Sequence, residues 1–305
     1  MKKGHYSKAR RQENFMGTLM ASGPLIGFLC FTCIPMLFSL IVSFTKLTSF
    51  DLSQMQWIGF DNYINLLKGE YYLLPYAIRN TLLWLLNVPL NMMISLFIAN
   101  LLSKKLKGSK FLRTILFIPS ICSTVAVTIM WGWILQDDYG IINTIFSSIG
   151  LEKIGFTSDA RYFMGTCLLI STWIYGTNIV LMSNALSSVN KEVKEAAQID
   201  GASDMYVFWK VTVPLISPTL FYLLITNFIV ASQELQIMQL LTSNGYGPEY
   251  SAVTLSYFIY LMVWGKNAVD YGFGVAAALS WLMAIVVMIV SFFNFKLSKK
   301  WVYYD

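Results

Sequence analysis

Charge is what this sequence has least of. Only 12% of its 305 residues are Asp, Glu, Lys or Arg, while 56% are hydrophobic. In soluble domains about a quarter of the residues are charged. Charge is wholly absent from six stretches, at residues 16–45, 80–103, 114–136, 162–190, 211–233 and 271–295. This distribution excludes an ordinary soluble domain.

The six uncharged stretches are long enough to cross a membrane. Each has at least 23 residues, which as a helix reach about 35 Å against a hydrocarbon core of about 30 Å. Strands of a membrane barrel would alternate in polarity, and these stretches do not. The sequence predicts an all-α polytopic membrane protein, with six transmembrane helices in a domain over residues 16–295. The first stretch is too long for a secretory signal, so we expect it to remain as an anchoring helix.

Groups that carry chemistry are also scarce. The single histidine, His5, lies in a basic tail where we expect it to be solvated. Cys30 and Cys33 have C-x-x-C spacing, but they lie in an apolar stretch without a second pair, so packing is the favoured interpretation. No G-x-x-x-x-G-K-[ST] phosphate loop is present. We therefore expect no catalytic residue, metal or cofactor on this chain.

The few basic residues are distributed unevenly between the stretches. Segments 1–15, 104–113, 191–210 and 296–305 together hold 16 Lys and Arg, whereas the three intervening segments hold 6. By the positive-inside rule, both termini and the 191–210 loop are cytoplasmic. The net charge of +6 therefore reflects topology rather than nucleic-acid binding.

A further uncharged run, 250–265, is too short for a seventh crossing, since it would reach only about 24 Å. A seventh crossing would also place the lysines of the C-terminal tail outside. Tyr257, Tyr260, Leu261 and Trp264 share one helical face. We expect a helix that lies at the outer surface or dips partway into the membrane.

The 191–210 loop is unusually polar for this chain and predicts two short helices. The run Lys191–Asp200 is rich in helix formers, and Gly201 can end it in a left-handed conformation. Ser203 or Asp204 can cap a second helix through Met205–Val211. An amphipathic loop resting on the membrane surface is the plain alternative.

Side chains within this loop also favour a partner protein. Ala196 and Ala197 give the first helix a small-residue face, which permits close approach of another surface. Phe208 and Trp209 place aromatic bulk in a loop that is otherwise water-facing, and exposed aromatic side chains suit a groove on a partner.

The stretch "EAAQIDGASDMYVFWKVTVP" closely resembles the signature of bacterial ABC importer permeases, E-A-A-x-x-x-G followed after nine residues by I-x-L-P. Val211 and Val213 replace the usual Ile and Leu, and Ala202 completes the D-G-A form frequent in the carbohydrate-uptake branch, the maltose-type sugar permeases. The resemblance implies the type I ABC importer permease fold, with this loop as the coupling helix. The residues that it assigns to ATPase coupling are Glu195, Ala196, Ala197, Asp200, Gly201 and Pro214.

Stretches with lower specificity, such as "WIGFDNYINLL" and "LTSNGYGPEYSAVTLSYFIYLMVW", also resemble sugar permeases. The resemblance implies a subunit of the bacterial plasma membrane that pairs with a second, different permease. The implied partners are two ATPase subunits, which hold the ATP and Mg, and an extracytoplasmic solute-binding protein. The ending "FKLSKKWVYYD" resembles the permease kind without a glycine-rich tail, which implies a heterodimer.

A sugar pathway needs amides that match hydroxyls and aromatic side chains among the spans. Each candidate has an alternative role, as an interfacial belt residue or as a hydrogen bond between helices. The candidates are Trp173, Tyr175, Asn178, Asn227, Gln233, Glu234 and Gln236.

Two other functions remain open from the residues alone. An ion-coupled secondary transporter of a small polar solute would be expected to show an internal repeat, and none is clear. Such transporters also commonly carry charged groups in mid-span, which these stretches lack. A scaffold or receptor subunit would not need the polar groups that occur at membrane depth.

Overall fold

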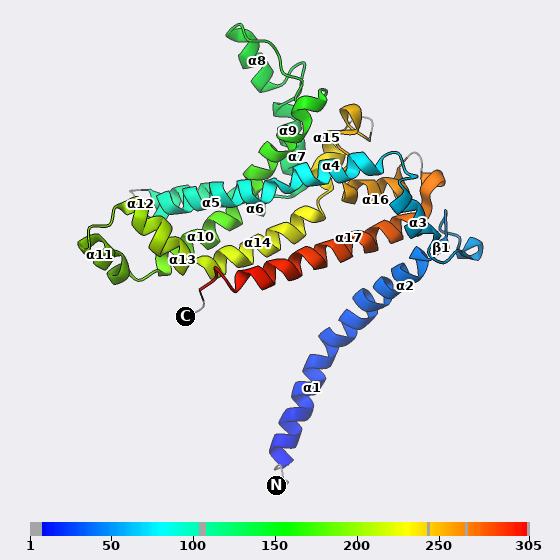
Figure 1. The fold of residues 1–305 in the computed structure, drawn as a ribbon, viewed down its shortest axis with the longest axis horizontal. Helices are drawn as coiled ribbons and strands as arrows, with labels where there is room; N and C mark the ends of the chain where they lie inside the picture. Colours follow the sequence, from blue (N-terminus) through cyan, green and yellow to red (C-terminus); the bar gives the residue numbers. More distant parts are fainter. Residues whose placement is uncertain (1–7, 104–107, 243–244, 266–267, 304–305) are drawn as a thin grey trace.

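The computed structural model describes residues 8–103, 108–242, 245–265 and 268–303, and nearly all of its regular structure is helical (Figure 1). Most long helices run side by side in one bundle. Two parts leave that bundle: the N-terminal helix and an arm that ends in α8 (Ile141–Ser148).

The N-terminal span is one rod made of α1 (Lys8–Phe28), a π-helical turn η1 (Leu29–Cys33) and α2 (Ile34–Ser43). It contacts the bundle near its C-terminal end, where α2 packs against α17 (Ala268–Ser298). The rod ends at Ser43, two residues before the predicted end of the first span at residue 45, because Thr45–Lys46 forms a short strand, β1.

Strand β1 pairs antiparallel with β2 (Gln56–Trp57), with Thr45 opposite Trp57, and the 3-10 turn η2 (Leu52–Gln54) lies between them. The buried Asn62, on α3 (Asp61–Lys68), donates to the carbonyl oxygens of Ser43 and Thr45, each at 2.9 Å. This amide therefore fixes the junction between the first span and the β1–β2 hairpin.

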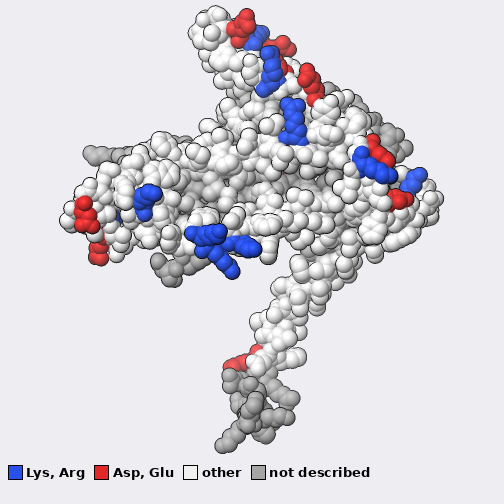
Figure 2. Space-filling model, in the orientation of Figure 1, with Lys and Arg blue, Asp and Glu red and all other residues white. Residues whose placement is uncertain are grey.

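Three helical rods are long and apolar enough to cross a membrane: Gln12–Ser43, Leu74–Ser103 and Tyr271–Ser298. The second joins α4 (Leu74–Leu85) to α5 (Asn87–Ser103). In Figure 2 the central bundle shows almost no charge, and charged side chains gather at its ends and on the α8 arm.

The three remaining predicted spans are helical but sharply bent. The pair α6 (Ser109–Ile121) and α7 (Thr124–Ile134) bends by 101°. The pair α9 (Ala160–Ile174) and α10 (Gly176–Ser188) bends by 51°. The helix Asp204–Leu215 meets α14 (Ser217–Ser232) at 68°. Counted as one span each, these pairs complete six, and the all-α polytopic fold is confirmed.

Each bend has a local cause. Pro119 lies in the last turn of α6, and Ser123 is extended, which ends that helix. At the second bend, a Cβ on Gly176 would overlap the Leu116 carbonyl oxygen of α6, so only glycine lets the two helices approach this closely. At the third bend, Pro218 begins α14, as proline does at a helix start.

The shorter elements lie between these spans. The helix Asp204–Leu215 is assembled from α12 (Asp204–Tyr206), the π-helical η3 (Val207–Thr212) and α13 (Val213–Leu215). Before it comes α11 (Lys191–Ile199). After α14 come α15 (Gln236–Leu241), the 3-10 turn η4 (Pro248–Tyr250) and α16 (Leu255–Trp264).

Helix α16 packs between α4 and α17, and Tyr257, Phe258 and Leu261 are buried. Trp264, predicted on the same face as Tyr257, is exposed and lies against Phe50. Other helices thus cover most of the predicted face, and the position of α16 at the outer membrane surface or partway into the membrane stays a prediction.

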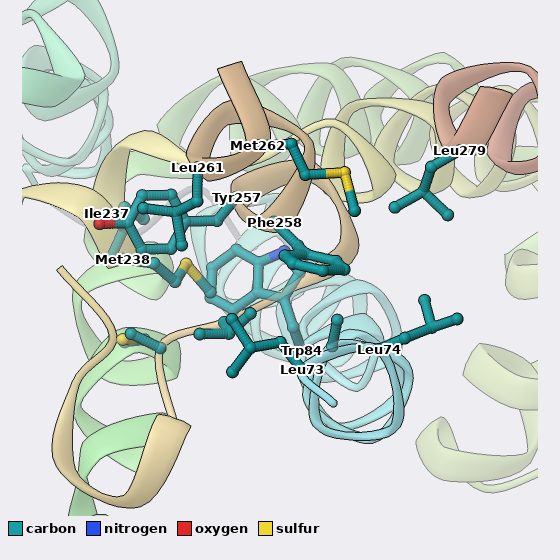
Figure 3. Close-up of a cluster of buried hydrophobic side chains, with 14 of the residues drawn as sticks. Leu73, Leu74, Trp84, Ile237, Met238, Tyr257, Phe258, Leu261, Met262 and Leu279 are labelled. Carbon is teal, nitrogen blue, oxygen red and sulfur yellow. The ribbon is translucent and has the colours of Figure 1, made fainter. Parts of the chain in front are cut away.

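The largest apolar core surrounds α16 (Figure 3). The Trp84 indole lies among side chains of α15, α16 and α17, including Met238, Phe258 and Leu279. Its Nε1 donates to the Ala231 carbonyl oxygen at 3.0 Å, so its polar group is satisfied within the core. This core holds α4, α14 and α15 in fixed positions around the cavity described next.

Candidate functional site

A cavity of about 390 Å³ lies where several helix junctions meet. Asn87 opens α5, Thr124 opens α7, Tyr175 separates α9 from α10, and Glu234 separates α14 from α15. Junctions expose backbone and polar side chains that a continuous helix would shield, and such irregularity is tolerated at membrane depth where it lines a cavity. The bends thus create a polar space inside an apolar bundle.

Two amide groups on the cavity wall lack partners. Asn178 on α10 and Asn227 on α14 are both buried, and the Nδ2 atom of each has no hydrogen-bond partner among the described residues. A buried unsatisfied donor costs about 1–3 kcal/mol. Both residues line the cavity, but the two Nδ2 atoms themselves are shielded, so a ligand that offers oxygen acceptors would reach them once the side chains turn.

The other polar atoms of the cavity wall are mostly oriented by protein contacts. Ser120 and Ser171 donate to carbonyl oxygens of their own helices. The Tyr175 hydroxyl forms a hydrogen bond with Asn87. Behind the wall, the buried Asn91 donates to Ser171 Oγ at 3.4 Å and also contacts Asn87. The cavity is therefore held in shape by a second layer of polar side chains.

Among the residues that the structure describes, Glu234 is the only charged one that lines this cavity. One of its carboxylate oxygens accepts the backbone N–H of Ile237 at 3.1 Å, which fixes the side chain at the start of α15. With one carboxylate and no cationic side chain on the wall, the cavity disfavours anionic ligands.

Four of the seven predicted pathway residues line the cavity: Tyr175, Asn178, Asn227 and Glu234. The other three lie elsewhere. Trp173 packs edge-on against Trp131, with ring centroids 5.4 Å apart. Gln233 lines a separate, mainly apolar hollow with Ser256 and Ser280, and Gln236 lines neither space.

Sequence reasoning missed several polar or aromatic residues of the wall. They come from six different helices and have no shared sequence motif, so only the fold brings them together. These residues are Trp84, Asn87, Ser120, Thr124, Ser171, Tyr222 and Thr226.

The 191–210 loop forms the two predicted helices, at the opposite end of the molecule from the β1–β2 hairpin (Figure 1). Asn190 caps α11, since its Oδ1 accepts from the Glu192 N–H at 3.0 Å. Gly201 follows α11 with φ +86°, the left-handed conformation predicted for it. Ser203 rather than Asp204 caps the second helix, accepting from the Tyr206 N–H. Asp204 instead accepts from Gln198 at 2.9 Å, which ties the two helices together.

The exposed surface of this loop includes an apolar patch. Ile199 is 86% exposed, and Met205, Tyr206 and Trp209 are each more than half exposed. The Trp209 indole N–H lies 3.1 Å from the Met205 sulfur, which orders the pair. An exposed apolar patch on an ordered loop is typical of a protein-binding surface.

One residue predicted to belong to this surface does not. Phe208 is half-buried and packs against the core beside Met182 and Leu220, with only its neighbour Trp209 facing outward. Nearby, Lys194 donates to the Leu186 carbonyl oxygen at 3.4 Å, and burial lowers the pKa of its ammonium group.

No cluster of three or more His, Cys, Asp or Glu side chains that could hold a metal ion occurs among the described residues. His5 lies outside the described residues. A bundle of up to six apolar spans, with a cavity that has a few polar groups on its wall and a loop with an exposed apolar patch, is typical of a membrane transport permease.

The chain belongs to the family of binding-protein-dependent transport system inner membrane components, whose profile matches residues 91–302. It is accordingly a transmembrane permease subunit of a bacterial importer, located in the inner membrane, and not an enzyme.

Similar proteins agree with this assignment. The probable ABC transporter permease protein YesP of Bacillus subtilis is 34% identical over 303 residues, covering 98% of this chain and 95% of that protein. The arabinooligosaccharides transport system permease protein AraP of the same organism is 28% identical, covering 90% and 85%. A chain of a bacterial alginate ABC transporter, solved with its alginate pentasaccharide-bound periplasmic protein, has a TM-score of 0.80 at 24% identity, covering 95% and 96%. This chain therefore has the type I importer permease fold.

Proposed function

We propose that this chain forms half of a pathway for the ATP-driven uptake of a neutral sugar or oligosaccharide. The observation that carries the proposal is a pair of amide groups on the wall of one cavity, on Asn178 and Asn227, whose donors have no partner among the described residues. Ligand pockets commonly measure about 300–1,000 Å³ and combine apolar walls with a few convergent polar groups. The cavity, at about 390 Å³, has this character.

The chemistry of the wall suits a hydroxylated ring. Hydroxyl and ring oxygens can accept from the two amides, while the Glu234 carboxylate can accept from hydroxyl donors. Tyr175 and Tyr222 offer aromatic faces for the apolar faces of a sugar ring. A single carboxylate without a cation favours a neutral substrate over the acidic sugars of the alginate transporter.

The apolar surface of the 191–210 loop is the proposed contact with an ATPase subunit. Glu195, Ala196 and Gly201 are exposed there, as a docking role requires, and Pro214 lies half-buried in α13, behind the contact. The ATPase subunits would hold the ATP and Mg. A second, different permease would supply the other half of the pathway, and a solute-binding protein would deliver the sugar. Loaded binding protein and ATP together would favour one of two conformations, and hydrolysis would reset it.

Reconstitution tests this function. The tagged chain, purified in mild detergent with its co-purifying subunits, is placed in proteoliposomes with maltooligosaccharides or arabinooligosaccharides and a matching binding protein. Uptake is expected only with ATP and with all subunits. Uptake driven by an ion gradient, by this chain alone, would overturn the proposal in favour of a secondary transporter.

A further inference from the structure

A hydrophobic groove of about 560 Å³ lies between α4, α14 and α17, three helices that run side by side in the bundle (Figure 1). Leu67, Leu82 and Val286 are among its lining residues, and each is more than half exposed. Among the described residues that line it, Thr81 and Ser232 are the only ones with polar side chains. The groove thus differs in chemistry from the polar cavity.

The two polar side chains of the groove already have hydrogen-bond partners. Thr81 Oγ1 donates to the Ala77 carbonyl oxygen at 2.7 Å and accepts the Leu255 N–H at 2.8 Å. Ser232 Oγ donates to the Phe228 carbonyl oxygen at 2.8 Å. Because a buried polar group costs free energy unless it is hydrogen-bonded, the part of a ligand that enters this groove should be apolar.

The groove is about as long as one leaflet of a membrane is thick. Along α4 it extends from Pro75 to Leu85, a rise of about 15 Å, which is half of a hydrocarbon core of about 30 Å. Along α17 it extends from Leu279 to Val287, a rise of about 12 Å. A helix of another subunit that crossed the membrane here would pack along the full depth of the bundle, whereas a lipid acyl chain extends through one leaflet.

Two cationic side chains lie at one end of the groove. Lys68, the last residue of α3, has a lining residue of the groove on either side of it in the chain. Arg79 is four residues after Pro75 and three before Leu82, so these three share a face of α4. Both cations are exposed, and with Glu70 the three charged groups have a net charge of +1. In Figure 2, side chains of both signs lie at the end of the bundle that carries α3.

We propose that this groove binds an acyl chain of a phospholipid, whose phosphate is held by Lys68 and Arg79. Arg79 is the last charged residue before the uncharged stretch 80–103, so this end of the groove meets a membrane surface, which the positive-inside distribution predicts to be the outer one. Ammonium and guanidinium groups form charge-assisted hydrogen bonds with phosphate oxygens. An apolar groove of one leaflet's length that ends beside two cations matches the two parts of such a lipid.

The proposed lipid site lies behind the polar cavity. Helix α14 lines both spaces, the groove with Phe228 and Ser232 and the cavity with Asn227 and Ala231. A bound acyl chain would therefore support α14 on the side away from the cavity. The inference goes beyond the proposed function, because it depends neither on the transported solute nor on the source of energy.

Photocrosslinking from the lipid tests the groove. The chain, purified with its co-purifying subunits, is reconstituted with phosphatidylglycerol that carries a photoreactive group on one acyl chain, and labelled peptides are identified by mass spectrometry. Labelling is expected within residues 74–85 and 279–287. Leu82→Trp, which fills the groove with a bulky ring, should reduce this labelling at least about fivefold. Met93→Trp is the matched control, because Met93 is exposed on the same rod but does not line the groove. It should leave the labelling within about twofold. Equal labelling in the two variants would overturn the proposal, since it would show ordinary lipid around the bundle.

A second set of variants tests the phosphate contact. The double variant Lys68→Gln and Arg79→Gln should reduce the labelling of the groove at least about threefold. Lys46→Gln removes an exposed cation on β1, outside the groove, and should leave the labelling within about twofold. Unchanged labelling in the double variant would contradict the phosphate contact.

The alternative occupant is a protein, and crosslinking from the groove distinguishes it from lipid. A photoreactive amino acid at Leu82 should give an adduct with phospholipid when the membrane is irradiated. An adduct with another polypeptide at this position would show that protein covers the groove, and would overturn the proposal.

Discussion

The cavity and the 191–210 loop are both incomplete surfaces, but they lack different things. At the cavity, polar donors on Asn178 and Asn227 are buried without partners. At the loop, apolar side chains such as Ile199 and Trp209 are exposed to solvent. In the proposed function, a small polar ligand would complete the first arrangement and an apolar protein surface the second. Buried polar groups are normally hydrogen-bonded, and large apolar patches are normally covered. The chemical kind of the missing partner can therefore be inferred from which of these two conditions a surface does not meet.

Glycine has a different role in each region: Gly176, beside the cavity, permits a close helix contact, whereas Gly201, in the loop, has a left-handed conformation. The largest predicted effect is at Gly176. Gly176→Ala places a methyl group against the Leu116 carbonyl oxygen and 2.9 Å from Phe117 Cα. Overpacking of this kind costs about 1–3 kcal/mol, and the α9–α10 bend beside the cavity would be displaced. Thermal unfolding in detergent should show a clear loss of stability. An unchanged melting temperature would mean that α6 and α10 are not in contact here.

The next prediction compares two buried asparagines, one with hydrogen-bond partners for its amide donor and one without. Asn80 donates to the Tyr250 and Val253 carbonyl oxygens at 2.8 and 2.9 Å, so Asn80→Leu should cost about 1–3 kcal/mol of stability. The Asn178 amide donor has no partner, so Asn178→Leu should leave stability unchanged or slightly raised. Differential unfolding of the two variants measures this contrast. Equal losses in both would mean that the Asn178 donor is already paired.

The loop is tested through its left-handed glycine. Gly201 has φ +86° with open space around it, so Gly201→Val has no clash but should cost about 1–2 kcal/mol in backbone strain. This corresponds to about a tenfold loss of the docking-competent conformation. The amount of ATPase that co-purifies is the measurement.

Gly69→Val is the matched control, because Gly69 has φ +75° and open space but lies far along the chain, after α3. It should retain the ATPase. Equal ATPase recovery in the Gly201 and Gly69 variants would show that the conformation of the loop at Gly201 is not needed for ATPase binding.

How far each region is predictable from sequence follows from the range of its contacts. The loop depends on neighbours in sequence, such as the turn at Gly201, which was predicted, and the helix cap, which was predicted at Ser203 or Asp204 and lies at Ser203. The cavity depends on contacts between distant residues: Asn87 and Tyr222 are 135 positions apart. Tyr175 and Asn178 were predicted from their polarity, and both line the cavity. Trp173 was predicted with them but packs against Trp131 instead, because the direction of a side chain turns by about 100° with each residue along a helix.

The smallest predicted effect is a pH dependence at Lys194. Burial lowers the pKa of this ammonium below its ordinary value of 10.5, so the unfolded chain binds more protons between the two values and stability rises with pH there. Lys194→Met should therefore be slightly more stable than the wild type at pH 7. That difference should shrink as the pH approaches 10.5, as measured by melting temperature. A constant difference would contradict the burial of this group.

Sugar uptake by the reconstituted complex carrying Asn178→Leu tests the central claim most directly. Loss of one hydrogen bond, about 0.5–1.5 kcal/mol, should reduce the apparent affinity for substrate by roughly two- to tenfold while the complex assembles normally. Asn80→Leu, despite its lower stability, should keep the wild-type affinity. If Asn178→Leu and Asn227→Leu both transport with the wild-type affinity, the cavity is not the sugar pathway.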